Sequence, residues 1–259
     1  MIIGYYQYAP VFLEPKENLE FLASELSTIS CDILVLPELS ISGYNFEHID
    51  QVHQCADACD GRTARFFRDL SKKTGTLYIY GFAEAFGTRL FNSAAAVDKG
   101  GLVHLYRKLH LFDREKQWFS PGNLPLEPFS LGDCRIGMLV CFDHFYPEAA
   151  RTLALKGTQI ICHPSNLVIP DTAQMTTRVR SLENRVFWVL ANRTGEERDL
   201  RFTGRSQTSN PAGALLSSSD EAFQGASLCE IHPGDALDKH ITGVNDLFAD
   251  RAAQYYVTD

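Results

Sequence analysis

The chain has 259 residues, of which 45% are hydrophobic and 22% charged, a composition typical of a globular protein that can bury a substantial core. Its net charge of −8 argues against a basic nucleic-acid-binding surface and leaves a small molecule as the expected partner. No apolar run approaches the roughly 18 residues that a membrane span needs, so we expect no integral membrane protein.

The cysteine count and the N-terminal sequence favour a reducing compartment over secretion. Residues 1–6 predict a strand rather than a signal peptide, because no basic segment precedes the apolar residues. The chain has seven cysteines, an odd number, which favours reduced thiols over a disulfide framework. We therefore expect a cytoplasmic protein.

The first hundred residues predict two kinds of strand arrangement. Apolar runs and helical spacing predict strands over 2–8 and 33–36, helices over 15–26 and 62–74, and strands over 77–85, 92–97 and 102–106. The early alternation predicts a β-α-β unit with helices packed on a sheet, and the last three strands predict an antiparallel meander.

The second half predicts one long loop and further alternation. Residues 108–128 carry Pro and Gly breakers and predict an irregular, functional loop. We then expect strands over 136–140, 159–162, 186–191, 204–209, 214–216 and 225–231, with helices from Pro147 through Leu155 and over about 171–185. Residues 245–256 are amphipathic and should dock on another surface, for example a second subunit. We find no linker and expect one domain over residues 1–259.

Cys141 follows the predicted strand over 136–140 and precedes the helix that begins at Pro147. A cysteine at a strand-to-helix turn lies near the positive end of a helix dipole, which stabilises a thiolate. The ordinary alternative is a buried cysteine that packs as a small hydrophobe.

Three further charged residues are candidates for the same chemistry. Glu38 suits a general base, Lys108 can stabilise an oxyanion, and Glu115 lies in the same long loop. The ordinary alternatives are a loop acid or helix cap, a surface lysine and a solvated charge run. Glu38, Lys108 and Cys141 each lie within about one residue of a predicted strand end, and we expect strands of one sheet to bring them to a common rim.

Several motifs in order along the chain resemble the nitrilase superfamily of carbon-nitrogen hydrolases. They are Pro37-Glu38-Leu39 before Ser42-Gly43-Tyr44, Tyr106-Arg107-Lys108-Leu109-His110-Leu111-Phe112 before Phe119-Ser120-Pro121-Gly122, Cys141-Phe142-Asp143 before Pro147-Glu148-Ala149-Ala150-Arg151, His163-Pro164-Ser165-Asn166, Leu182-Glu183-Asn184-Arg185 and Ala191-Asn192-Arg193-Thr194-Gly195. The resemblance runs from residue 2 to the tail.

The resemblance implies a role for each candidate residue. Cys141 would form a thioester with the substrate acyl group, Glu38 would act as the base, and Lys108 would stabilise the tetrahedral intermediate together with the backbone N–H of Phe142. Glu115 would position substrate and support Lys108. No metal ion and no cofactor is expected.

The implied fold is a four-layer α-β-β-α sandwich of two mixed sheets flanked by helices. Subunits would pair through the helix after Pro147 and the helix over about 171–185, giving a homodimer or a higher oligomer. The tail from about residue 240 would help to hold that interface.

The implied substrate is a small amide or N-carbamoyl compound that releases ammonia. Relatives that act on nitriles often carry Trp-Glu directly after the nucleophile, whereas this chain has Phe142-Asp143. The loop over residues 108–115 also resembles that of thermostable aliphatic nitrilases, so nitriles stay open. The expected pocket walls are Tyr44, Phe112, Trp118, His144 and Asn166.

Three rival interpretations remain. A Cys-His hydrolase would use His144, His110 or His163 as the base; a metal site could use His53, Cys55 and Cys59, although paired Cys-x-x-Cys knuckles are absent. The third is a catalytically inactive scaffold that keeps the sandwich for binding.

Overall fold

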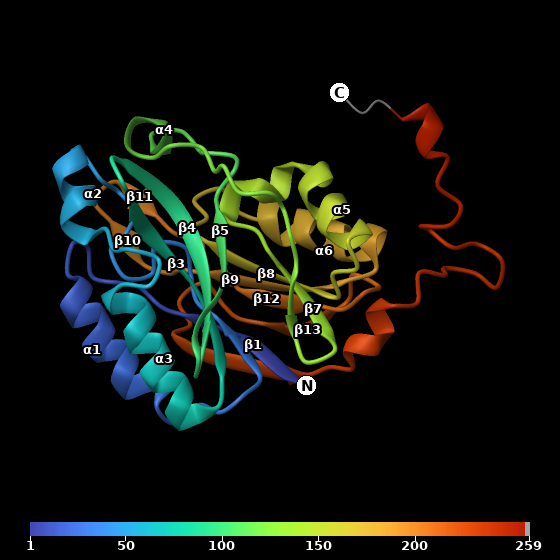
Figure 1. Ribbon diagram of the computed structural model, residues 1–259, viewed down its shortest axis with the longest axis horizontal. Coiled ribbons are helices and arrows are strands. Elements are labelled where there is room, and N and C mark those ends of the chain that lie inside the picture. Colours follow the sequence, from blue (N-terminus) through green and yellow to red (C-terminus); the bar gives the residue numbers. More distant parts are fainter. Residues whose placement is uncertain (257–259) are drawn as a thin grey trace.

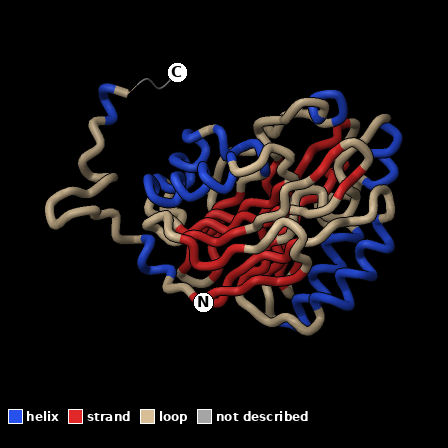
Figure 2. The backbone as a smooth tube through the Cα atoms, turned by 180° about the vertical axis from the view of Figure 1, so that it is seen from behind, coloured by secondary structure: helices blue, strands red, loops and turns tan. Residues whose placement is uncertain are grey.

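The computed structural model describes residues 1–256 and contains two six-stranded sheets packed face to face between pairs of helices (Figure 1). Helices α1 (Pro15–Leu26) and α3 (Arg62–Thr74) cover the outer face of one sheet, and α5 (Pro147–Leu155) and α6 (Thr172–Asn184) cover the other (Figure 2). The expected four-layer α-β-β-α sandwich is therefore confirmed.

The first sheet has the order β14-β1-β2-β3-β4-β5. Its strands are β1 (Ile2–Gln7), β2 (Ile33–Val35), β3 (Leu77–Phe86), β4 (Arg89–Asp98), β5 (Gly101–Arg107) and β14 (Gly225–Glu230). The β1–β2 and β2–β3 pairs are parallel, whereas the β3–β4 and β4–β5 pairs are antiparallel. Strands β2 and β5 thus run in the same direction and end at the same edge.

The second sheet has the order β13-β12-β9-β8-β7-β6 and is also mixed. Its strands are β6 (Phe129–Leu131), β7 (Cys134–Met138), β8 (Ile160–Ser165), β9 (Phe187–Asn192), β12 (Gln207–Ser209) and β13 (Leu215–Ser218). The β1–β9 contacts and a shared apolar core join the two sheets. Residues such as Tyr5, Val35, Ile136 and Val189 are fully buried in that core.

Helix boundaries follow local signals in the sequence. Prolines stand at the first position of α1 and α5, where the missing N–H has no cost. Gly75 ends α3 with φ +77°, in the left-handed conformation that glycine adopts without strain. Three of the four helix ranges expected from sequence, 15–26, 62–74 and 147–155, agree with the structure, and α6 lies within the fourth, expected over about 171–185.

Other expected ranges were wrong or incomplete. The strand expected over 136–140 ends at Met138, and a 3₁₀ helix, Cys141–Phe145, separates it from α5. The strand expected over 204–209 begins only at Gln207, because Gly204 turns with φ +54° and donates to the carbonyl of Arg193. The sequence interpretation omitted α2 (Ile49–Cys55), α4 (Glu115–Trp118), β6 and the hairpin of β10 (Glu196–Glu197) and β11 (Leu200–Arg201).

The C-terminal tail runs away from the sheets beyond α5 (Figure 1). Phe248 docks between two cations: the Arg151 guanidinium lies 4.9 Å and the Lys239 ammonium 4.7 Å from its ring centroid. Tyr255 is 82% exposed. Within the described residues, no helix is long and apolar enough to cross a membrane.

Gly81 on β3 allows the segment after β2 to cross the first sheet. A Cβ at this position would collide with the backbone of Glu38 and would lie 2.6 Å from the backbone nitrogen of Leu39. The N–H of Gly81 donates to the carbonyl of Pro37 at 3.0 Å. Only glycine therefore lets the chain carrying Glu38 approach β3 so closely.

We expect Gly81→Ala to lower the free energy of unfolding by about 2 kcal/mol or more and to reduce activity, because the added methyl displaces Glu38. Chemical denaturation and initial rates measure both effects. Gly234→Ala is the matched control, because nothing lies within 4 Å of a Cβ there. Wild-type stability and activity in Gly81→Ala would contradict this explanation.

Candidate active site

Glu38, Lys108 and Cys141 come together at one end of the sandwich, although they are far apart in the sequence. Lys108 directly follows β5, while Glu38 and Cys141 each lie three residues beyond the last residue of β2 and β7. The expectation that one sheet would deliver all three was wrong. Glu38 and Lys108 follow strands of the first sheet and Cys141 follows a strand of the second, so the site lies where the two sheets meet.

Extended backbone carries two of these residues past the strand ends. The N–H of Leu36 donates to the carbonyl of Ile79 at 2.7 Å, and that of Leu139 donates to the carbonyl of Cys162 at 3.1 Å. These bonds continue the sheet pairing by one residue on each side, which holds the following turns rigidly.

The Lys108 ammonium is shared by two buried carboxylates. Its Nζ lies 2.7 Å from Oε1 of Glu38 and 2.8 Å from Oε1 of Glu115. All three side chains are buried. Burial lowers the pKa of Lys108, but the carboxylates of Glu115 and Glu38 outweigh that effect and hold its pKa above the usual value. The lysine therefore stays positively charged.

Neutral groups also donate to each carboxylate, and one of them is the backbone N–H of Phe112, which donates to Glu115 Oε2 at 3.3 Å. Asn92 Nδ2 donates to Glu38 Oε1 at 2.7 Å, and the Tyr44 hydroxyl donates to Glu115 Oε1 at 2.8 Å. Oε2 of Glu38 is buried without a hydrogen-bond partner among the described residues. Burial raises the pKa of Glu115 to about 7, against the lowering effect of Lys108. The cluster can therefore accept a proton.

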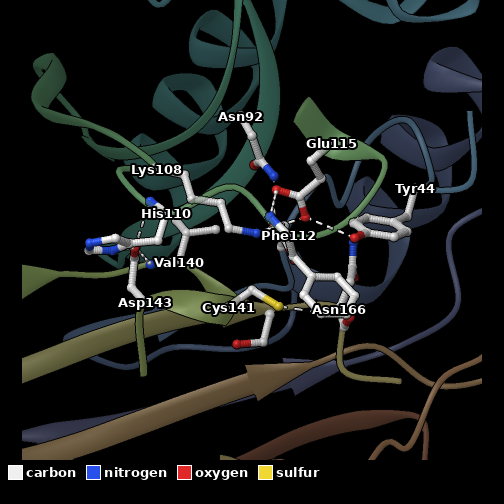
Figure 3. Close-up of polar contacts among 12 residues, drawn as sticks. Tyr44, Asn92, Lys108, His110, Phe112, Glu115, Val140, Cys141, Asp143 and Asn166 are labelled. Carbon is white, nitrogen blue, oxygen red and sulfur yellow. Dashed lines mark hydrogen bonds and ion pairs between the residues drawn. The ribbon is translucent and has the colours of Figure 1, made fainter. Parts of the chain in front are cut away.

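The sulfur of Cys141 lies beside this cluster (Figure 3). Its thiol donates to the backbone carbonyl of Asn166 at 3.9 Å. Burial raises the pKa of the thiol well above its usual value, Glu38 raises it further, and Lys108 opposes them. This differs from the expectation of a thiolate stabilised by a helix dipole: the resting group is a neutral thiol, which needs a base.

Cys141 occupies a strained turn. Its φ is +44°, a left-handed conformation that costs a non-glycine residue about 1 kcal/mol or more. His163 Nε2 lies 2.9 Å from the carbonyl oxygen of Cys141, which can only accept, so His163 carries its proton on Nε2. This bond fixes the strained peptide.

Asp143 ties the cysteine turn to the loop that carries Lys108. Its buried carboxylate accepts from the Tyr106 hydroxyl at 2.7 Å, the backbone N–H of Val140 at 2.9 Å and His110 Nδ1 at 2.7 Å. The His110 ring stacks on Tyr146 with centroids 3.5 Å apart. These contacts join β5, the loop and the 3₁₀ helix in one network (Figure 3).

The expected wall residues line two adjoining cavities. Tyr44, Phe112 and Trp118 line a cavity of about 130 Å³ that also contacts Glu115. Phe112, His144 and Asn166 line a smaller cavity, of about 20 Å³, and Cys141 also lines this cavity. Phe112 and Val168 border both cavities.

The rival sites find no support in the described residues. No histidine ring makes a hydrogen bond to the Cys141 thiol: His110 contacts Asp143, His144 contacts Thr176, and His163 contacts the Cys141 carbonyl. Within residues 1–256 no group of three or more His, Cys, Asp or Glu side chains could hold a metal ion. His53, Cys55 and Cys59 thus do not form such a group.

A model of the carbon-nitrogen hydrolase family matches residues 3–236. The chain belongs to this family. This carbon-nitrogen hydrolase is 42% identical over 258 residues to a protein named nitrilase from Pyrococcus abyssi, with 98% of each chain covered. It is 33% identical over 188 residues to an (R)-stereoselective amidase from a Pseudomonas species, covering 71% of this chain and 68% of the relative.

Solved structures agree with that assignment. A variant of an amidase of the nitrilase superfamily from Nesterenkonia superposes with a TM-score of 0.81 at 25% identity, covering 98% of this chain and 95% of the amidase. Another variant of the same amidase carries the acetamide moiety of fluoroacetamide on its active-site cysteine.

The sequence interpretation missed Asn92 and Asp143 as parts of the site, and it considered His163 only as the base of a rival Cys-His mechanism. Asparagine is depleted from strands, yet Asn92 stands in a mostly apolar run over residues 90–97 that predicts a strand, and this was a usable signal in the sequence. Asp143 and His163 act through backbone groups of the cysteine turn, and nothing in the local sequence indicates those contacts.

We expect Asp143→Asn of the hydrolase to lower stability by about 2 kcal/mol and to slow thioester formation, because the amide cannot accept all the bonds made to the carboxylate. Thermal unfolding and single-turnover kinetics measure these effects. Among the described residues the exposed Asp69 forms ion pairs with Arg68 and Lys72 alone, so Asp69→Asn is a control that should behave as the wild type. Equal rates in the two variants would refute the role of Asp143.

Proposed function

We propose that this hydrolase cleaves the carbon-nitrogen bond of small amides and N-carbamoyl compounds through a thioester on Cys141. The observation that carries the proposal is the Lys108 ammonium held between Glu38 and Glu115 beside the Cys141 thiol. A nucleophile, a base and a cation are the groups that acyl transfer requires. The covalent chemistry of the Nesterenkonia amidase cysteine supports the same role for Cys141.

Glu38 is proposed as the base because its Oε2 has no other partner among the described residues. It takes the thiol proton as sulfur bonds to the carbonyl carbon. When the carbon-nitrogen bond breaks, Glu38 passes this proton to the nitrogen, and ammonia leaves. Glu38 then deprotonates a water molecule that attacks the thioester; the thiolate leaves and recovers the proton, so the cycle balances.

Lys108 and the backbone N–H of Phe142 are proposed to hold the oxyanion. Lys108 has three N–H donors, of which two point to Glu38 and Glu115, so one remains for substrate. Phe142 lies in the first turn of a 3₁₀ helix, where backbone N–H groups lack partners within the helix. Glu115 would hold Lys108 in place and is itself held by Tyr44.

The cavities support a small, partly apolar substrate. Tyr44, Phe112 and Trp118 form aromatic walls around the larger cavity, and His144 and Asn166 reach the smaller one. We propose these five residues as the substrate-binding set.

Nitrile hydrolysis is the second candidate, favoured by the 42% identity to the Pyrococcus abyssi protein named nitrilase. A nitrile needs the same nucleophile and an added water molecule. Ammonia release from ω-amides, N-carbamoyl amines and small nitriles, measured side by side, decides between them. Turnover of nitriles alone would reject the amidase assignment.

We expect Cys141→Ala to lose on the order of a thousandfold of activity on every substrate while keeping its fold by circular dichroism. Cys59, which is partly buried and lies outside the site, provides the control variant Cys59→Ala. An alkylating agent should modify Cys141 in preference to the other six cysteines if the protein is a working enzyme rather than a scaffold.

Glu38→Gln should lower the rate of thioester formation about 100-fold or more, whereas His144→Ala should still form the thioester. Rapid-quench mass spectrometry of the acyl-enzyme measures both rates. The reverse pattern would instead support a Cys-His mechanism.

We also propose a homodimer or higher oligomer that uses the outer face of α6. Met175, Val179 and Leu182 are 63%, 45% and 47% exposed and follow helical spacing i, i+4, i+7. These apolar side chains form one stripe, and the tail with its exposed Tyr255 would extend the interface. The seven free cysteines support a reducing, cytoplasmic location.

Val179→Asp should shift the assembly toward monomer in sedimentation velocity, because a buried carboxylate without a partner opposes association. Val103→Asp, on the exposed face of β5, is the control and should leave the assembly unchanged. A wild-type monomer, or dimers in Val179→Asp, would reject this interface.

A further inference from the structure

The small cavity at Cys141 combines an apolar wall with polar side chains: Asn166 and His144 have unused hydrogen-bonding atoms, and the Thr172 hydroxyl donates to the carbonyl of Pro170 at 3.3 Å. Phe142, Phe145 and Ile169 are among its apolar lining residues. Its volume of about 20 Å³ is enough for one water-sized group, since a bound water needs roughly 10–15 Å³.

The unpaired amide of Asn166 is the stronger indication that this cavity binds a polar group. Both its Nδ2 and its Oδ1 are buried without a hydrogen-bond partner among the described residues, and the residue is only 2% exposed. Leaving a buried amide unpaired costs about 1–3 kcal/mol. The backbone carbonyl of the same residue contacts the Cys141 thiol at 3.9 Å. An unpaired donor and acceptor therefore lie on the residue that touches the sulfur (Figure 3).

His144 adds a second unused atom. Its Nδ1 lies 2.7 Å from the Thr176 hydroxyl, and within residues 1–256 its Nε2 makes no hydrogen bond. The Thr176 hydroxyl can donate to Nδ1, or it can donate to the carbonyl of Thr172 at 3.0 Å and accept from Nδ1. In the first case Nε2 carries the ring proton, and in the second it carries a lone pair, so His144 can adapt to either kind of ligand.

Among the described residues that line the small cavity, none is Asp, Glu, Lys or Arg. Burial lowers the pKa of His144 to about 4, so the ring is neutral near pH 7. A carboxylate or ammonium placed here would lose its hydration without gaining a counter-ion. A neutral group with its own donor and acceptor fits these partners better.

We infer that Asn166 and His144 form a subsite for a neutral hydrogen-bonding group on the acyl part of the substrate, close to the scissile carbonyl. Hydroxyl and carboxamide groups have both a donor and an acceptor, and a ureido N–H has a donor that Oδ1 of Asn166 can accept. The inference rests on the proposed amidase function and narrows it: a purely alkyl acyl group would leave the Asn166 amide unpaired, and a charged acyl group would be desolvated.

Matched substrates test the subsite. Lactamide and isobutyramide differ by a hydroxyl in place of a methyl, and propylurea and pentanamide differ by an N–H in place of a methylene. The measured quantity is the ratio of kcat/KM for the polar member to that for the apolar member, compared between wild type and variant so that intrinsic reactivity cancels.

Asn166→Leu should lower this ratio about tenfold or more in the pair that the wild type turns over, because the polar group loses its partner. His144→Phe keeps an aromatic ring and should lower the ratio as well. This variant tests the subsite if Asn166→Leu does not fold. Ile169→Leu changes only an apolar wall of the same cavity and should leave the ratio within about twofold.

A second pair of substrates, succinamide and succinamate, tests whether the cavity disfavours a charged acyl group. Succinamide should be hydrolysed more efficiently than succinamate by the wild type, because the carboxylate of succinamate finds no cation in the cavity. Ratios that stay at the wild-type value in both Asn166→Leu and His144→Phe, with amides still hydrolysed, would overturn the subsite alone. A wild-type enzyme that hydrolyses none of these amides would overturn the proposed function together with it.

Discussion

The site depends on one ammonium group that two carboxylates share in the interior of the protein. Lys108, Glu38 and Glu115 are almost completely removed from water, and each would be costly to bury alone. Removing one partner from a buried ion pair typically costs about 3–5 kcal/mol, because the other charge is left uncompensated. With the thiol neutral, the cluster has one more carboxylate than cations, which suits a group that must accept a proton.

The same burial explains why the nucleophile needs its neighbours. A thiol whose pKa is raised by desolvation does not ionise by itself at neutral pH, so Cys141 can attack only while Glu38 receives its proton. The turn that aims the sulfur is strained, with φ +44°. The bonds from His163 to the Cys141 carbonyl and from the N–H of Val140 to Asp143 offset the cost of this strained backbone.

Much of the fold could be predicted because residues next to each helix boundary determine where the helix begins or ends. Pro15, Gly75 and Pro147 each mark a helix end, and the agreement of those ranges with the structure follows from backbone constraints. The short 3₁₀ helix over Cys141–Phe145 and the Glu196–Arg201 hairpin have no such markers. Their conformations are set by contacts with distant segments, which propensity and periodicity do not report.

The residues of the candidate site could likewise be predicted from the sequence, but their arrangement in space could not. Strand ends and motif order indicate its charged groups and its thiol, yet only the topology shows that they come from two sheets.

Among the described residues, five of the fifteen buried polar side-chain atoms that lack a hydrogen-bond partner belong to residues of the candidate site or its supports, and ten lie elsewhere in the fold. Oε2 of Glu38, Oδ1 of Asn92, both amide atoms of Asn166 and Nδ1 of His163 are buried without partners among the described residues. A fold optimised only for stability would pair or remove such atoms, since each one left unpaired raises the free energy of the native state. Under the proposed function, Oε2 of Glu38 and the amide of Asn166 are the atoms that the thiol, water and substrate would pair with, so binding would supply hydrogen bonds that folding leaves open.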